Sequence, residues 1–66
     1  MKSMYILTLC NEPITDIVIS ESFAVITRDE NCEPIKFLNK DSVVKMCLAL
    51  SVMFNDYDFG WERIYV

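Results

Sequence analysis

Residues 39–56, NKDSVVKMCLALSVMFND, decide the fold class of this chain because they contain its longest near-apolar run. The run, Val43 to Phe54, has twelve residues and one lysine. That length is typical of a helix rather than a strand, and it is too short to span a bilayer. Asn39 or Asp41 can cap the first turn, where Asp41 also places a negative charge at the positive end of the helix dipole. We therefore predict one helix over about residues 41–55.

The rest of the chain alternates between β-prone segments and polar turns. The turn signals are NEP at residues 11–13 and DENCEP at residues 29–34. Between and beyond them the side chains are rich in β-branched and aromatic types, which favour strands. Strands are predicted at residues 4–10, 14–20, 23–28 and 35–38, with a fifth at residues 61–66 after the helix.

The fourth predicted strand has the features of a sheet edge. Pro34 precedes it and Lys36 lies within it, and both are common at edges. We expect this strand to form a hairpin with the third strand, and we expect Gly60 to serve the turn that follows the helix. The order β-β-β-β-α-β predicts an α+β fold: a small antiparallel or mixed sheet of four to five strands with one helix packed on one face.

The length, cysteine count and net charge limit the classes of protein to which the chain can belong. Its 66 residues are expected to form a single small globular domain, residues 1–66, of marginal stability. Its three cysteines, Cys10, Cys32 and Cys47, are odd in number and widely spaced, and the first residues carry no secretion signal. These features predict reduced thiols in a cytoplasm. The formal net charge of −4 argues against direct binding to nucleic acid, and no membrane segment is expected.

The residue types also argue against catalysis and metal binding. The chain has no histidine, and no two of its cysteines have the spacing of zinc ligands. Two groups of carboxylates occur, one in residues 29–33 and one in residues 56–62, but a domain of this size offers them little cleft. We therefore expect neither an enzyme nor a cofactor nor a metal site.

The predicted helix has more apolar surface than one sheet needs. At 100° per residue, one broad face should cover the sheet, while Ser42, Lys45 and Asp56 should be exposed. A second stripe is formed by Val44, Leu48 and Val52. Either a neighbouring loop folds over this stripe, or it is an interface with a second copy or another protein. The face expected to cover the sheet consists of Val43, Met46, Cys47, Leu50, Met53 and Phe54.

Alternation divides the last predicted strand into two chemically different sides. Ile64 and Val66 are expected to face the core. Trp61, Arg63 and Tyr65 then form a row on the open side, and these three residue types are enriched in interface hot spots. Two interpretations stay open for this row: contact with a partner protein, or local packing against Tyr5 or Phe23.

The loop before that strand, NDYDF, alternates acids with aromatics. It can tuck Tyr57 and Phe59 inward and leave Asp56 and Asp58 in solvent. It can instead form an acidic–aromatic patch that docks on a basic surface, and in the extreme case mimics a nucleic acid. Asp56, Tyr57 and Asp58 are therefore candidate partner-binding residues.

One resemblance concerns the order of elements alone. FLNKDSVVKMCLAL at residues 37–50, followed by GWERIYV at residues 60–66, resembles the layout of several small bacteriophage-encoded inhibitors of host proteins. It implies no site residue. The sequence thus predicts a non-enzymatic protein-binding module, an inhibitor or modulator of phage or mobile-element type. The alternatives are a homo-oligomer, such as a homodimer formed through the outer helix stripe, and an acidic nucleic-acid mimic.

Overall fold

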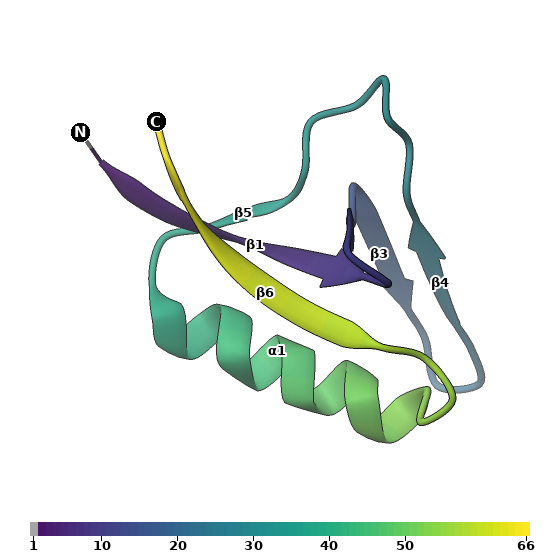
Figure 1. The fold of residues 1–66 in the computed structure, drawn as a ribbon. Coiled ribbons are helices and arrows are strands. Elements are labelled where there is room, and N and C mark those ends of the chain that lie inside the picture. The colour runs from purple at the N-terminus through teal and green to yellow at the C-terminus, as the bar shows by residue number, and fades with distance from the viewer. Residues whose placement is uncertain (1) are drawn as a thin grey trace.

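The computed structural model describes residues 2–66 and confirms the α+β class. Five strands precede one helix and a sixth strand follows it (Figure 1). The strands form two small antiparallel sheets where one sheet was expected. The elements are β1 Ser3–Leu9, β2 Glu12–Pro13, β3 Asp16–Ile19, β4 Ala24–Thr27, β5 Lys36–Phe37, α1 Lys40–Met53 and β6 Phe59–Tyr65.

Strand β1 is the centre of the larger sheet. β6 pairs with it along its whole length, from Ser3 opposite Tyr65 to Leu9 opposite Phe59. The other side of β1 is shared, because β5 pairs with Tyr5 and Ile6 while β2 pairs with Thr8 and Leu9. Both β5 and β6 run antiparallel to β1, so they are parallel to each other, and β5–α1–β6 is a βαβ unit that straddles β1.

Strand β2 was expected to be a turn, and the hairpin before it explains the difference. Cys10 and Asn11 form a two-residue loop with φ values of 52° and 67°. Positive φ at both central positions is the geometry that matches the twist of paired strands. The usual sequence signal is Asn-Gly or Asp-Gly, and Cys-Asn does not carry it. Pro13 fits because β2 lies at the sheet edge, where its missing N–H is not needed.

Strand β5 pairs with β1, which corrects the expected hairpin with the third strand. The loop after β4 turns away at Asp29, whose carbonyl accepts a hydrogen bond from the N–H of Cys32. Ile35 then donates its N–H to the carbonyl of Ile14 over 3.1 Å, and Ile14 donates its own N–H to Leu7 over 2.9 Å. Ile14 therefore links β5 to the central strand, and β3 and β4 are left as a separate two-stranded sheet.

The core lies between α1 and the larger sheet. Leu7, Ile14, Val43 and Leu50 have no exposed surface, and Tyr5 and Leu9 complete the buried cluster. The helix begins after Asn39, whose side-chain oxygen accepts hydrogen bonds from the N–H and the hydroxyl of Ser42. No helix in residues 2–66 is long and apolar enough to cross a membrane.

Gly60 lies inside β6, opposite Thr8, and not in the turn that was expected. A Cβ atom at this position would lie 3.0 Å from the hydroxyl oxygen of Thr8, which is tighter than most Cβ contacts. The glycine therefore allows the buried Thr8 side chain to lie close against β6.

Candidate functional site

The row Trp61, Arg63 and Tyr65 lies on the helix-covered side of the larger sheet. Directly paired residues of antiparallel strands have their side chains on the same face. Trp61 is opposite Leu7 and Arg63 is opposite Tyr5, and both partners belong to the core cluster under α1. The row was expected on the side away from the core, and the register shows the reverse.

The residues expected to face the core differ correspondingly. Ile64 is half-buried and Val66 is exposed, and both lie outside the core cluster. Ile64 pairs with Met4, so it lies on the side of the sheet away from α1. On the helix-covered side, Trp61 and Tyr65 remain exposed, so α1 does not cover all of that face. The margin of that face therefore stays accessible, and the row occupies it.

The row packs on its own sheet and still reaches the surface. The Trp61 ring meets the Tyr5 ring edge-on, with 6.1 Å between centroids, and 36% of Trp61 stays exposed. The Arg63 guanidinium lies 5.7 Å from the Tyr5 ring centroid, and its Nη2 donates to the Tyr5 hydroxyl over 3.4 Å. Hydrogen bonding to Tyr5, and secondarily to Tyr65, raises the pKa of Arg63 above its usual value. Trp61 and Arg63 therefore pack against Tyr5 and are still exposed to solvent.

A second cation reaches this surface from the helix. Lys40 is the first residue of α1, where a positive charge opposes the helix dipole. Its Nζ lies 5.3 Å from the centroid of the Trp61 ring, a cation–π contact that offsets part of this cost. We call Lys40, Trp61, Arg63 and Tyr65 the aromatic–cation surface.

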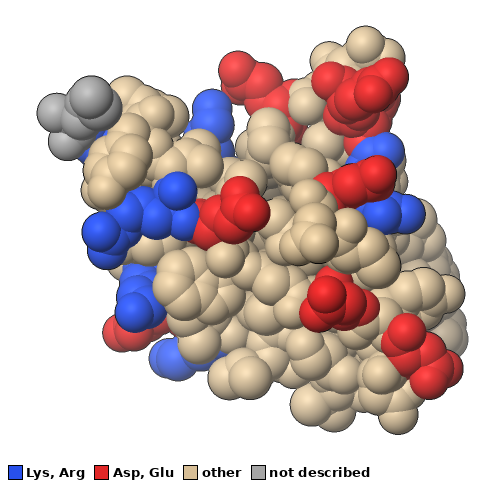
Figure 2. All heavy atoms as spheres, viewed as in Figure 1, with Lys and Arg blue, Asp and Glu red and all other residues tan. Residues whose placement is uncertain are grey.

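The charges of this acidic chain are unevenly distributed. In Figure 2, blue spheres gather mostly over the end of the molecule where the chain termini and the start of α1 lie in Figure 1. Red spheres gather mostly on the opposite side, over the β4–β5 loop and the segment after α1. The aromatic–cation surface therefore belongs to the basic end of a chain whose formal net charge is −4.

The outer helix stripe is only partly covered. Val44 is half-buried and packs against the core cluster, whereas Leu48 is 61% and Val52 is 82% exposed. Met53, which was expected to face the sheet, is about half exposed because α1 ends there. Ser42, Lys45 and Asp56 are exposed as predicted.

In the loop of residues 55–59, one aromatic side chain is turned inward and the other is exposed. Phe59 turns inward and lies 6.1 Å from the Phe54 ring, centroid to centroid. Tyr57 meets Phe54 edge-on and remains mostly exposed, and Asp56 and Asp58 are in solvent. These three exposed residues lie beyond the C-terminal end of α1, while Lys40 begins its N-terminal end, so they are not part of the aromatic–cation surface.

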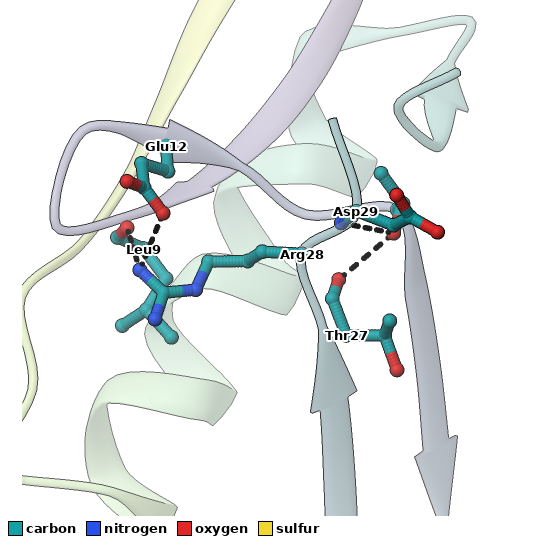
Figure 3. A network of polar contacts seen from close by, with 6 residues as sticks. Leu9, Glu12, Thr27, Arg28 and Asp29 are labelled. Atoms are coloured by element: carbon teal, nitrogen blue, oxygen red, sulfur yellow. Dashed lines mark hydrogen bonds and ion pairs between the residues drawn. The ribbon is translucent and has the colours of Figure 1, made fainter. Parts of the chain in front are cut away.

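A polar network joins the smaller sheet to the β1–β2 loop (Figure 3). The Nη1 atom of Arg28 donates to the carbonyl of Leu9 over 3.2 Å and lies 2.9 Å from a carboxylate oxygen of Glu12. On the other side of β4, the hydroxyl of Thr15 donates to the carbonyl of Thr27 and accepts from the N–H of Asp29. These contacts fix the hairpin against β1, and none was predicted from the sequence.

Next to this network is an open cavity of about 670 Å³, lined in part by Arg28, Asp29 and Cys32. The Cys32 thiol donates a hydrogen bond to Asp29 Oδ2 over 3.4 Å. This bond, and then the negative charge of Asp29, raises the pKa of Cys32 above its usual value. The thiol is therefore a poor nucleophile at neutral pH. Within residues 2–66, no three cysteine or acidic side chains are grouped so as to hold a metal ion.

Asp29→Asn is expected to make Cys32 react faster with iodoacetamide near neutral pH. The substitution removes the carboxylate that accepts the thiol's hydrogen bond and carries the negative charge, so the pKa of Cys32 falls and the thiolate fraction rises. Peptide mapping by mass spectrometry would follow alkylation of Cys32 alone. Glu30→Gln is the matched control, since the thiol donates its hydrogen bond to Asp29. Equal rates in both variants would contradict this account.

Sequence reasoning found the row but missed Lys40. Alternation along one strand is a local signal, and it correctly places Trp61, Arg63 and Tyr65 on one side. The approach of Lys40 to Trp61 joins α1 to β6, and no local pattern reports such a contact. Comparison with known proteins adds no relative: no family model, no curated protein and no solved structure matches this chain.

Proposed function

We propose that this chain is a non-enzymatic protein-binding module, an inhibitor or modulator of another protein, and that its aromatic–cation surface binds an acidic segment of that partner. The observation that carries the proposal is the exposed Trp61 ring with Lys40 over it, next to Arg63, which lies over the Tyr5 ring that Trp61 also contacts. Trp, Tyr and Arg are the residues that most often dominate binding energy in interfaces.

The geometry supports an acidic partner in two ways. Arg63 is held in place by Tyr5, so it loses less conformational freedom on binding than a free surface arginine. Carboxylates of the partner would meet Arg63 and Lys40, while an apolar or aromatic side chain would cover Trp61. The basic end would also steer an acidic partner toward this surface and away from the acidic end.

Arg63→Ala is expected to weaken partner binding by about 2 kcal/mol, or roughly 30-fold in Kd, as for a hot-spot residue. The experiment compares the proteins captured from lysate of the native host by the unmodified chain, by Arg63→Ala and by a control, Lys36→Ala. Lys36 is also an exposed cation, but it lies in β5 and pairs with Glu33 over 3.5 Å.

The expected result is a protein retained by the unmodified chain and by Lys36→Ala, lost with Arg63→Ala, and released by salt because surface charges are screened. The part of the captured protein that binds the aromatic–cation surface should be an acidic segment. Equal capture by Arg63→Ala and the unmodified chain would reject the aromatic–cation surface as the binding site.

A structural homo-oligomer is the second candidate function. The exposure of Leu48 and Val52 on α1 favours it, because two large apolar side chains on adjacent turns of a helix form an apolar patch that a second copy could bury. In this alternative the outer helix stripe is the subunit contact, and Val52→Lys would abolish association.

A further inference from the structure

The outer edge of β4 is a second surface that can accept a partner. β4 pairs with β3 on one side, and in residues 2–66 no strand pairs with its other side. Figure 1 shows β4 at the margin of the molecule. A two-stranded sheet is marginal by itself, so an additional strand at this edge would stabilise it.

The hydrogen bonds of the hairpin show which backbone groups point outward from β4. Ser20 donates its N–H to the carbonyl of Phe23 over 2.8 Å and closes the turn. Hydrogen-bonded and non-bonded pairs alternate along an antiparallel ladder. The N–H and C=O groups of Val25 therefore face β3, and those of Ala24 and Ile26 face away from it.

The other edges in this molecule carry the features that block strand addition. β2 contains Pro13, β5 follows Pro34 and contains Lys36, and β6 contains Glu62 and Arg63. On the outer edge of β3, the N–H of Ile17 is already bonded to Asp16 Oδ1 over 3.0 Å. Charges, prolines and occupied donors are the usual protection of edge strands.

The edge of β4 has none of these features. Residues 23–27, FAVIT, contain no charge and no proline. Phe23 and Val25 are about half exposed on the outer face of the hairpin. Val18 pairs with Val25 on this face and is also about half exposed. An uncharged edge favours a second copy as the partner, because a charge at the residue on the two-fold axis would face the same charge of the other copy.

We propose that this protein forms a two-fold symmetric dimer by antiparallel pairing of β4 with β4 of a second copy, with Val25 at the axis. In this register Ala24 lies opposite Ile26 of the other copy and Ile26 opposite Ala24, so all outward N–H and C=O groups of both residues are used, in four hydrogen bonds. Phe23 lies opposite Thr27. The two hairpins become one four-stranded sheet, and Val18 and Val25 of both copies form one apolar strip across it.

The surface that such a strand pair covers is small, so the dimer is expected to be weak, with Kd in the micromolar range. Sedimentation velocity from about 10 μM to about 1 mM should show the mean mass rising toward twice the monomer mass. Val25→Lys places two like charges on the axis and should keep the chain monomeric. Val52→Lys, a matched change at an exposed valine of α1, should leave the association unchanged.

A cysteine substitution at Val25 tests the register without relying on disruption. A central non-hydrogen-bonded pair has Cα atoms about 4.5 Å apart, within the range of a disulfide. On mild oxidation, Val25→Cys should form a disulfide between the introduced thiols of the two copies, identified by peptide mass spectrometry. Val52→Cys should form no such bond between its introduced thiols.

Three outcomes would each overturn the proposal. The first is a chain that stays monomeric at all concentrations. The second is a dimer that Val52→Lys abolishes and Val25→Lys leaves intact, which would assign the contact to the outer helix stripe. The third is a Val25→Cys variant whose introduced thiol fails to couple to its copy in the partner chain.

Discussion

Leu7→Ala is expected to leave the protein largely unfolded near room temperature. Leu7 lies in the middle of β1, has no exposed surface, and is in the core cluster with Val43 and Leu50 of α1. Replacing a fully buried leucine by alanine costs about 3 to 5 kcal/mol, through lost burial and the cavity left behind. A single core of this size rarely supplies more than about 3 to 5 kcal/mol of net stability, so the substitution removes most of it.

The measurement is urea unfolding of both proteins, followed by the fluorescence of Trp61 and by far-UV circular dichroism. Leu48→Ala is the matched control, because Leu48 is mostly exposed on α1 and alanine favours helix. We expect the control to unfold within about 0.5 kcal/mol of the unmodified chain. A Leu7→Ala midpoint equal to that of the control would show that β1 and α1 do not share one core.

Ile14→Asn is expected to have an effect of similar size for a different reason. Ile14 belongs to no strand, yet it is fully buried and its backbone joins Leu7 to Ile35. The substitution removes buried apolar surface and places an amide where it has no partner, for a total of about 4 kcal/mol. The hydrogen bond from Ile35 to Ile14 should weaken first, because it ties β5 to the rest of the sheet.

Amide hydrogen exchange at Ile35, together with urea unfolding, would measure this effect. Ile19→Asn applies the same change to an isoleucine that is half exposed in β3. It should cost about 1 kcal/mol or less, measured at low protein concentration. If both substitutions destabilise the protein equally, Ile14 does not have the linking role that its two hydrogen bonds indicate.

Much of the local structure follows from the sequence. The apolar run from Val43 predicts α1, with ends displaced by one or two residues, and the β-prone segments predict β1, β3, β4 and β6. The pairing of these strands does not follow, because hydrogen bonds between distant segments leave no local periodicity. Ile14 shows why: its neighbours predict the start of a strand, but its role is to bridge β1 and β5.

The candidate site was predicted to a similar extent. Alternation grouped Trp61, Arg63 and Tyr65 correctly, yet it placed them on the side away from the core. Both sides of β6 carry large apolar atoms, so composition alone does not identify the side that α1 covers. The deciding facts are the burial of Tyr5 and Leu7 under α1 and their register with Arg63 and Trp61. Both facts require the tertiary structure.

The pairing of β1 with β6 has a mechanical consequence. Lys2 and Val66 exchange two backbone hydrogen bonds, of 3.1 and 2.9 Å, at one end of this antiparallel pair. Tension applied between residues 2 and 66 therefore pulls along the direction of the hydrogen bonds, which lie perpendicular to the strands. The load falls on one rung at a time, so β6 peels from β1 as a zipper opens, and the aromatic–cation surface at Tyr65 and Arg63 is dismantled before the core beneath α1 is stretched.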